Sequence, residues 1–516
     1  MDHGTYLRRF RKEQSEREGV ALNQVLKDPQ IDALVNKRPV PQTKYQLRDV
    51  SGVGPVTVEK YGDDILEILQ REETNEEPDI EGMLGDTYAS LSEEQKKVLT
   101  LAYGGHNLLM TGQGGVGKSY LIKLLIKVLE KKAYRVQVCA LTGAASELLD
   151  CPSKTIHAWS GTRIIRGHPE KIIQRTVKNK TAVRAWRNLD VLIIDEVSML
   201  SKKHFDILNT IGQRIRKNKK SFGGIQVIFS GDFYQIPPVA DSDPTSGCFC
   251  FESKGWVSTI LSKDVVELTK VFRQRDKKWL KMLKQIRKGG YSLGTVNALN
   301  DRVALPFDPD NVPTRITPSR NNCNLINQRE MAKLDSETNT FLMEVIDNHR
   351  EFYPPEMVEG ATRSLKKGMM SEFLPLKIGA EVMCIANIDL ESQRQIVNGS
   401  LGVIRDWNDE GYPRVEFRNG RILDMVPHVI NSETVDGLSI KQVPLMPAWA
   451  ITTHKSQGVT LDEGIIDAGS DNFEYGQVYV ALSRVKTLEG LYLTSFDRFK
   501  IKANPKVTAY YDSLSD

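Results

Sequence analysis

Apolar and polar residues alternate in two different rhythms along the chain, and the change of rhythm divides it into parts. In the first 70 residues the apolar side chains recur at helical spacings, from Leu7 and Phe10 to Leu34 and Val35, which predicts a bundle of short helices. The acidic stretch at residues 72–86 carries seven acidic and no basic residues, so it predicts a flexible linker.

Short apolar runs separated by helical segments follow the acidic stretch. These runs are residues 107–110, 135–141, 190–194 and 224–230. Their alternation with helices predicts a parallel sheet that is covered by helices on both faces. From about residue 340 the segments become short and alternating, with Asn-Gly and Asp-Glu-Gly turns, which predicts a small antiparallel barrel inserted in the chain. The α/β rhythm returns at Ala448 and continues to Leu493.

Residues 107–119 place a glycine loop between an apolar strand and a helix. Several backbone N–H groups must converge on one phosphate, which glycines permit, while a lysine spans the outer phosphates and a hydroxyl holds magnesium. By chance the pattern Gly-x4-Gly-Lys-Ser/Thr would occur in roughly one chain in fifty of this length. We therefore expect the chain to bind a nucleoside triphosphate and Mg²⁺. The candidate residues are Gly112, Gly114, Gly115, Val116, Gly117, Lys118 and Ser119.

Two further polar groups follow apolar strands in the same predicted sheet. Asp195 and Glu196 end the run that begins at Val191; a carboxylate there can hold Mg²⁺ and its neighbour can accept a proton from an attacking water. A Gly-Asp turn follows the next run, and Gln235 lies three residues after Asp232. Side chains at the carboxyl end of a parallel strand face the nucleotide crevice, so Gln235 is a candidate sensor of the γ-phosphate.

Charge is distributed unevenly behind a net charge of +4. Residues 163–187 carry eight Lys or Arg and one acidic residue, and residues 202–220 carry seven Lys or Arg and one acidic residue. Two basic segments flanking a nucleotide site favour a polyanionic partner.

Other function classes receive little support. No apolar run approaches the roughly 20 residues that span a bilayer, so we expect no membrane, and no apolar leader begins the chain. The six cysteines are scattered without the spacing of a zinc site, which predicts reduced thiols in an intracellular protein. They are Cys139, Cys151, Cys248, Cys250, Cys323 and Cys384.

Taken together, the motifs resemble a superfamily 1 helicase of the 5′-to-3′ subgroup. Residues 204–228, immediately before Gly231-Asp232-Phe233, resemble the signature segment of the Pif (petite integration frequency) family. The resemblance implies that Gln95 reads adenine, that Arg273 and Arg484 reach the γ-phosphate, and that Gly458 lies at the nucleotide. Its implied catalytic set is Lys118, Glu196, Gln235, Arg273 and Arg484, with Ser119 and Asp195 on Mg²⁺. Its implied contacts to DNA are Thr142, Gly143, His157, Thr453, His454, Lys455, Ser456 and Thr460.

The same resemblance implies an α/β fold class: two RecA-like P-loop motor domains with an inserted SH3-like β-barrel and a wedge element, preceded by an all-α domain. The implied boundaries are a helical domain at 1–71, an acidic linker at 72–87, a first motor domain at 88–265 with the wedge at about 161–188, a second motor domain at 266–340 and 446–516, and the inserted domain at 341–445. Residues 397–402 match a loop of that barrel. The loop sequence Gly114-Gly115-Val116 stands where many relatives have Ala-Gly-Thr, and Tyr234 where Leu is commoner; neither change removes a catalytic group.

The N-terminal helical region resembles the helicase-and-RNase-D C-terminal (HRDC) domain, on residues 6–11, 47–54 and 59–62. Gly52-Val53-Gly54 before a helix offers N–H groups to a phosphate. Residues 1–71 nevertheless carry twelve basic against eleven acidic residues, so DNA binding and a docking or structural role both stay open.

These features predict an ATP- and Mg²⁺-dependent DNA helicase that moves 5′ to 3′ on single strands and acts at DNA junctions, in replication, recombination or repair. We expect a monomer when free, in the compartment that holds the DNA, and no nuclease motif is present. Two alternatives stay open: a helicase on RNA or RNA–DNA hybrids, because backbone-tracking grooves barely distinguish the sugars, and an ATP-switched clamp that remodels nucleic acid without processive unwinding.

Overall fold

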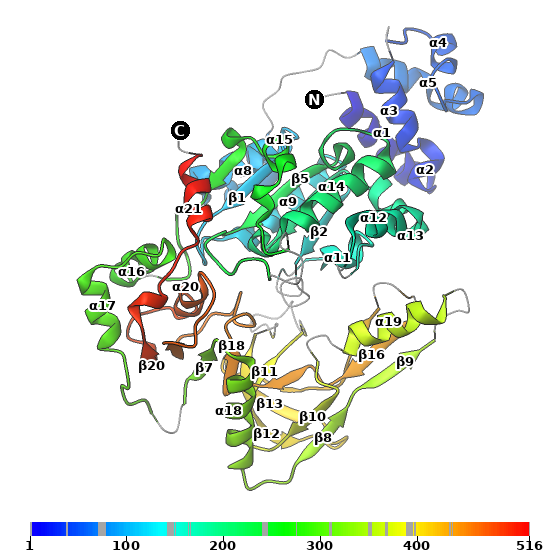
Figure 1. Cartoon of the computed structure of the whole chain (residues 1–516). Coiled ribbons are helices and arrows are strands. Elements are labelled where there is room, and N and C mark those ends of the chain that lie inside the picture. The colour runs from blue at the N-terminus through cyan, green and yellow to red at the C-terminus, as the bar shows by residue number, and fades with distance from the viewer. Residues whose placement is uncertain are drawn as a thin grey trace.

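A computed structural model describes most of the chain. The described residues are 3–37, 40–70, 79–141, 149, 151–163, 165, 167–239, 246–274, 276–308, 312–348, 353–366, 370–386, 388, 396, 399–432, 435 and 437–514. They form two lobes that are each built on a parallel sheet, an inserted β domain, and a separate helical domain at the N-terminus (Figure 1). The expected α/β architecture is confirmed. Within the described ranges, no helix combines the length and the apolar character needed to cross a membrane.

The N-terminal domain is a bundle of five helices with a core of its own. They are α1 (His3–Glu18), α2 (Leu22–Val25), α3 (Asp28–Asn36), α4 (Lys44–Arg48) and α5 (Pro55–Gln70). The apolar residues at helical spacings close this core: Leu7, Ile31, Leu34, Leu47 and Ile65 are all fully buried. Because these side chains come from α1, α3, α4 and α5, the bundle is held together by long-range packing.

The acidic stretch is only partly what its composition predicts. Residues 71–78 lie outside the described residues, but α6 (Ile80–Leu84) and α7 (Asp86–Ala89) follow directly. Ile80 and Leu84, four residues apart, are buried in the core of the first motor domain, and the Asp79 carboxylate caps α6 by accepting a hydrogen bond from the Gly82 N–H. The second half of the predicted linker is therefore a packed helix.

The first motor domain is built on a six-stranded, wholly parallel sheet in the order β3-β2-β4-β5-β1-β6. Its strands are β1 (Leu108–Thr111), β2 (Val136–Ala140), β3 (Ser153–Thr155), β4 (Val191–Asp195), β5 (Gln226–Gly231) and β6 (Val265–Glu267). Its helices are α8 (Glu93–Tyr103), α9 (Lys118–Lys131), α11 (Ile156–Trp159), α12 (Pro169–Lys178), α13 (Lys180–Arg187), α14 (Lys202–Arg216) and α15 (Lys254–Thr259). Along β4, Val191 and Ile193 enter one core while Leu192 and Ile194 enter the other, so the strand is buried on both faces.

The second motor domain has a four-stranded parallel sheet in the order β18-β7-β19-β20. Its strands are β7 (Thr314–Thr317), β18 (Ala450–Thr452), β19 (Gly464–Ala468) and β20 (Leu491–Phe496), and its helices are α16 (Lys277–Arg287), α17 (Leu293–Asn300), α18 (Arg320–Ala332) and α20 (Gln477–Leu482). The last helix, α21 (Pro505–Asp512), departs from the predicted boundary. Val507 is buried in a core of the first sheet, and the Tyr511 ring stacks on Tyr234 with 5.1 Å between centroids, so α21 ties the chain end to the first motor domain.

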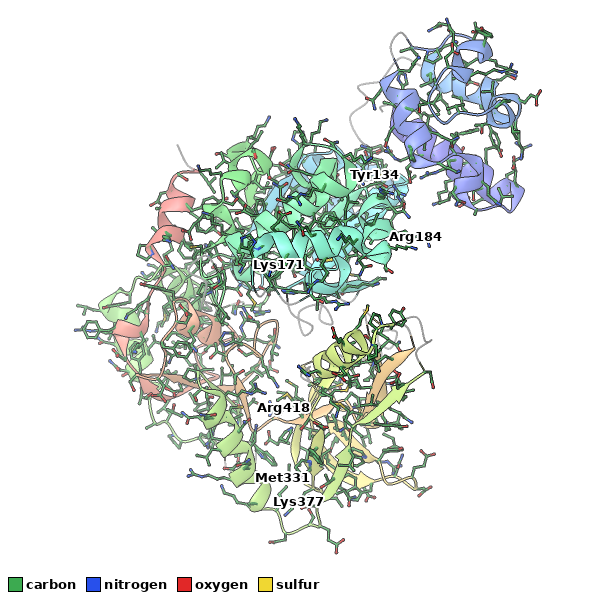
Figure 2. The ribbon with its side chains drawn as sticks, turned by 45° about the vertical axis from the view of Figure 1, so that its right-hand side comes forward. Tyr134, Lys171, Arg184, Met331, Lys377 and Arg418 are labelled. Carbon is green, nitrogen blue, oxygen red and sulfur yellow. The ribbon has the colours of Figure 1, made fainter. Side chains whose placement is uncertain are left out.

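The inserted domain holds antiparallel sheets between β7 and β18. Its elements are β8 (Asn339–Leu342), β9 (Glu344–Asp347), α19 (Pro355–Lys366), β10 (Phe373–Leu376), β11 (Glu381–Cys384), β12 (Leu401–Trp407), β13 (Pro413–Phe417), β14 (Ile422–Asp424), β15 (His428–Asn431), β16 (Leu438–Gln442) and β17 (Leu445–Pro447). Its largest sheet runs β14-β13-β12-β11-β17. Met331 of α18 is buried in the core of this domain, and Lys377 donates a hydrogen bond to the Leu334 carbonyl at 2.6 Å, so α18 joins this domain to the second motor domain (Figure 2).

Two glycines allow α14 to lie directly against the turn at Ser221–Gly224 that leads into β5. A Cβ at Gly212 would be 2.6 Å from the backbone carbon and oxygen of Phe222, and Gly223 has φ +67°. Phe222 itself is fully buried. This close approach sets the position of β5, and β5 ends at the Gly231-Asp232 turn.

Gly212→Ala is expected to destabilise the first motor domain. The new methyl group meets rigid backbone, so the cost of overpacking, about 1–3 kcal/mol, outweighs the helix propensity gained. Urea unfolding followed by circular dichroism measures the change. Gly360→Ala in α19 is the matched control, because nothing lies within 4 Å of a Cβ there. Equal unfolding midpoints for the two variants would contradict this account.

Candidate functional site

The glycine loop between β1 and α9 forms a cradle in which only glycine fits. Gly115 and Gly117 have φ values of +88° and +84°, which L residues rarely adopt. A Cβ at Gly112 would be 2.5 Å from the Leu268 carbonyl oxygen, and one at Gly115 would be 2.5 Å from Cβ of Arg273. Backbone N–H groups at the start of a 14-residue helix are thereby left accessible to an anion.

Lys118 is held by the loop itself. Its Nζ donates hydrogen bonds to the carbonyls of Gly112 at 2.6 Å and Gln113 at 3.2 Å. Burial lowers the pKa of Lys118, while the carboxylates of Asp232, Glu196 and Asp195 act in the opposite direction. The ammonium therefore lies among the carboxylates, with Ser119 next to it at the helix start.

Asp195 and Glu196 leave the end of β4, which neighbours β5 and lies two strands from β1. Burial raises the pKa of Asp195; burial and the adjacent Asp195 charge raise the pKa of Glu196 to about 7. The Oε2 atom of Glu196 is buried and has no hydrogen-bond partner among the described residues. The hydroxyl of Ser119 and the carboxylate of Asp195 are oxygen donors of the kind Mg²⁺ prefers, and Glu196 is placed to accept a proton.

The two predicted arginines converge on the loop from the other side of the cleft. A Cβ at Gly114 would be 3.1 Å from Nη2 of Arg484 and 3.3 Å from Nη1 of Arg273. Arg484 is oriented by the Val480 carbonyl at 2.9 Å and the Ser483 hydroxyl at 2.7 Å, whereas Nη1 of Arg273 is buried without a hydrogen-bond partner in the described structure. Burial and the charge of Arg273 lower the pKa of Arg484 to about 9. A buried cation, Arg484, beside a partly buried one, Arg273, suits an anionic ligand.

The remaining predicted nucleotide residues surround this cradle. Gln95 is buried; its Oε1 accepts the Ser92 N–H at 3.0 Å, and its Nε2 lies 3.4 Å from a Cβ position at Gly117. The Phe272 ring approaches that same position to 3.6 Å and is half exposed, which makes it a candidate adenine contact that the motif reading did not single out. Gln235, three residues after Asp232, is buried. Gly458 is exposed and lies two residues after Ser456, whose carbonyl accepts a hydrogen bond from Arg484.

Beneath the cradle lies a buried ion pair between the two motor domains. Asp232 of the first domain has no exposed surface. Its carboxylate accepts hydrogen bonds from Nε and Nη2 of Arg287, on α16 of the second domain, at 3.0 Å each. The Tyr479 hydroxyl accepts the Gly114 N–H at 3.2 Å and donates to Asp232 at 3.4 Å. Arg287 and Tyr479 thus connect the glycine loop to the second domain. Sequence reasoning missed both, because their partners lie far away in the chain.

A groove of about 2580 Å³ runs between the first motor domain, the second motor domain and the inserted domain. Among the described residues, six Lys or Arg and two acidic residues line it, so the described lining carries a positive net charge. The basic residues are Arg163, Arg175, Arg320, Lys366, Lys377 and Lys455. The Phe373 and Phe473 rings also line it and are 64% and 74% exposed, which suits stacking on unpaired bases.

Three of the predicted DNA contacts line this groove: His157, His454 and Lys455. Burial lowers the pKa of His157 to about 4, so its ring is neutral near pH 7 and offers stacking and hydrogen bonds. Burial also lowers the pKa values of His454 and Lys455. Thr142 and Gly143 lie outside the described residues.

The other three predicted contacts do not line the groove. Thr453 and Ser456 are buried and point inward: Thr453 donates to the Thr317 carbonyl at 3.2 Å, and Ser456 donates to the Thr453 carbonyl at 2.8 Å. Their hydroxyls close the turn that presents His454 and Lys455. Thr460 is exposed but lies away from the lining. The alternating burial within one short turn explains why a motif alone does not separate the two roles.

Sequence comparison identifies relatives of both parts of the chain. The PIF1-like helicase family matches residues 90–293, and the HRDC domain matches residues 5–69. The chain is 35% identical to the human ATP-dependent DNA helicase PIF1 over 84% of its own length and 65% of that protein, just under two thirds. It is 32% identical to ATP-dependent DNA helicase Pif1 of Bdellovibrio bacteriovorus, over 84% of this chain and 94% of that protein.

Solved structures agree with these matches. The crystal structure of Pif1 helicase from Candida albicans superposes with a TM-score of 0.69 at 33% identity, covering 82% of this chain and 99% of that one. The structure of Bacteroides Pif1 bound to ssDNA superposes with a TM-score of 0.57 at 26% identity, over 82% of this chain and 96% of that one.

Arg287→Ala is expected to destabilise the contact between the motor domains by about 3–5 kcal/mol, because it leaves the Asp232 carboxylate buried and unpaired. Differential scanning calorimetry measures the loss, and the exposed Lys284→Ala on the same helix serves as the control. A transition that is unchanged in Arg287→Ala would show that the pair contributes nothing.

Proposed function

The chain belongs to the PIF1-like helicase family, and from this premise we propose that it is an ATP-dependent DNA helicase that moves 5′ to 3′ on single strands and separates duplexes at junctions. The Candida albicans and Bdellovibrio bacteriovorus relatives are each named ATP-dependent DNA helicase. Solved structures of Bacteroides Pif1 include one in complex with ADP-AlF4 and one bound to ssDNA, which supports a nucleotide and single-stranded DNA as ligands of this chain.

One observation carries the proposal. Arg273 and Arg484 meet beside Gly114 of the glycine loop, while the unpartnered Oε2 of Glu196 lies buried at the end of β4. Phosphoryl transfer spreads negative charge over the transferred group, and guanidinium groups stabilise that charge. A nucleotide cradle alone would not need two converging arginines from the far side of the cleft.

Each group then has a defined task. Lys118 and the loop N–H groups would bind the phosphates, while Ser119 and Asp195 would hold Mg²⁺, which neutralises phosphate charge when bound. Glu196 accepts a proton from the attacking water, and Gln235 senses the γ-phosphate by hydrogen bonding to it. The two arginines stabilise the transition state. Because Arg484 belongs to the second motor domain, hydrolysis requires that the cleft be closed.

The short turn at residues 453–456 connects this chemistry to the groove. The Ser456 carbonyl accepts a hydrogen bond from Nη1 of Arg484 at 3.4 Å, and the preceding residues His454 and Lys455 line the groove. Movement of Arg484 with the nucleotide state is therefore transmitted to groove residues through two peptide units. We propose that this link converts cleft closure into movement along a single strand. We also propose that the protein acts in the compartment that holds the DNA.

Glu196→Gln is expected to lower kcat for ATP hydrolysis by about 10²–10⁴-fold, because the amide cannot accept a proton. A phosphate-release assay on single-stranded DNA measures kcat, and binding of a fluorescent nucleotide analogue is expected to persist. Loss of nucleotide binding together with hydrolysis would show that Glu196 acts structurally instead.

Strand separation is expected on partial duplexes with a 5′ single-stranded DNA tail and not on those with a 3′ tail. Gel assays on matched DNA and RNA loading strands, with Glu196→Gln as the inactive control, measure it. Preference for an RNA tail would identify the helicase as one acting on RNA or hybrids. Single-strand-stimulated hydrolysis with every duplex left intact would identify a remodelling clamp.

Lys455→Ala is expected to weaken binding of single-stranded DNA a few-fold and to make log Kd less dependent on log salt by about 0.7, the contribution of one phosphate contact. Fluorescence anisotropy from 50 to 300 mM NaCl measures both. Lys486→Ala is the control, because Lys486 is paired with Asp462 at 2.6 Å and does not line the groove. Equal salt slopes for the two variants would remove Lys455 from the interface.

A further inference from the structure

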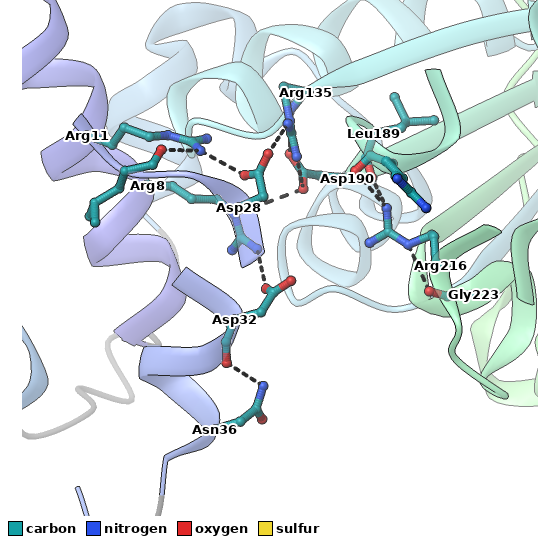
Figure 3. A network of polar contacts seen from close by, with 12 residues as sticks. Arg8, Arg11, Asp28, Asp32, Asn36, Arg135, Leu189, Asp190, Arg216 and Gly223 are labelled. Carbon is teal, nitrogen blue, oxygen red and sulfur yellow. Dashed lines mark hydrogen bonds and ion pairs between the residues drawn. The ribbon is translucent and has the colours of Figure 1, made fainter. Parts of the chain in front are cut away.

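The helical domain contacts the first motor domain through an alternating series of arginines and aspartates (Figure 3). Arg11 pairs with Asp28 at 2.8 Å, Asp28 with Arg135 at 2.5 Å, and Arg135 with Asp190 at 2.9 Å. Arg8 continues the series, 4.0 Å from Asp190 and 3.8 Å from Asp32. These six residues, Arg11, Asp28, Arg135, Asp190, Arg8 and Asp32, are called the ionic ladder below.

The motor domain presents its half of the ladder in a fixed geometry. Arg135 uses Nε and Nη2 on the Asp190 carboxylate, at 2.9 and 3.1 Å, and the Asp190 N–H returns a bond to the Arg135 carbonyl. Only Nη1 is left to face outward, and it meets Asp28. Burial would raise the pKa of Asp190, but the hydrogen bonds and charge of Arg135 hold it below its ordinary value. An ordered guanidinium loses little freedom when a second carboxylate docks on it.

Two arginines of the helical domain, Arg11 and Arg8, are engaged in contacts at this face. The Arg11 side chain is only 6% exposed, and it holds Asp28 and the Leu26 carbonyl; Arg8 lies over the Tyr134 ring at 5.8 Å. The Arg11 guanidinium is buried and the Arg8 side chain is 18% exposed, so little of either is open to a phosphate backbone while the domain is docked. Residues 1–71 are nearly neutral, so charge does not favour a nucleic acid at this face.

The ladder ends at the root of the basic helices α12 and α13, which form the predicted wedge. Arg216 of α14 donates from Nη1 to the carbonyls of Trp186 and Leu189, each at 3.0 Å, and so ties down the segment that returns from α13. Asp190 is the next residue, and β4 begins directly after it. Figure 1 also shows the helical domain beside α13 and α14. The docked helical domain therefore contacts Asp190, in the short segment that connects the predicted wedge to β4.

We propose that the α1–α3 face of the helical domain is an intramolecular docking surface for the first motor domain, and that the ionic ladder makes this domain a brace that holds the wedge during strand separation. The docking part stands on the contacts alone. The bracing part rests on the proposed helicase function. The partner of this face is the pair Arg135 and Asp190, which directly precede strands β2 and β4 of the motor sheet.

Two variants of the full-length chain release the domain from opposite sides. Asp28→Arg places a cation between Arg11 and Arg135, and Arg135→Gln removes the guanidinium while leaving the helical domain unaltered. Asp64→Arg is the matched control, because it makes the same charge reversal on an exposed position of α5. Asp28→Glu keeps a carboxylate at this position, so this variant is expected to retain docking in part.

Small-angle X-ray scattering of each variant measures docking without reference to activity. Both releasing variants are expected to increase the maximum particle dimension and the radius of gyration, whereas Asp64→Arg leaves both unchanged. Unchanged scattering in both Asp28→Arg and Arg135→Gln would overturn the docking. Because Arg135→Gln does not alter the helical domain, misfolding of that domain in Asp28→Arg does not obscure the result.

Activity assays then test the brace. Release is expected to lower the rate of unwinding of a 5′-tailed duplex by about three- to tenfold, the size of loss that coupling of this kind produces, with single-strand-stimulated ATP hydrolysis unchanged. Released variants that unwind at the control rate would overturn bracing and leave docking intact. A several-fold loss of affinity for single-stranded DNA in Arg135→Gln would assign the face to nucleic acid instead. If Asp64→Arg itself fails to unwind, the proposed function fails and not the ladder.

Discussion

The buried pair between Asp232 and Arg287 is the contact on which the arrangement of the cleft depends. Two motor domains must meet over the glycine loop, and a carboxylate with no exposed surface is stable there only if a cation from the facing domain neutralises it. Tyr479 extends the pair to the Gly114 N–H, so the loop, the Gly-Asp turn of the first domain and α16 of the second form one hydrogen-bonded unit.

This unit explains how the nucleotide cleft and the groove act together. Arg484 follows α20, the helix that carries Tyr479, and its Nη1 reaches the Ser456 carbonyl in the turn that presents Lys455. The second motor domain therefore bears Arg484, which lies beside the glycine loop, and also part of the groove wall. The inserted domain is attached to that wall through α18.

Much of the fold is local and could be predicted from the sequence. The strand, loop and helix around Gly112 to Ser119 are contiguous, as are β4 and the carboxylates that follow it, so their spacing alone defines them. Arg287 and Tyr479 could not be found in this way, since they meet Asp232 across 55 and 247 residues. The inward orientation of Thr453 and the packing of α6 and α21 are likewise decided by tertiary contacts, which no local pattern encodes.

We propose that closure of the two motor domains on the glycine loop drives directed movement along a single strand. Stopped-flow translocation on DNA labelled with a fluorophore at one end tests it most directly, comparing the unaltered chain with Arg484→Ala. ATP-dependent arrival is expected at the 3′ end only, and it is expected to be abolished in Arg484→Ala although that variant still binds the strand. Arrival at the 5′ end, or undiminished translocation without Arg484, would contradict it.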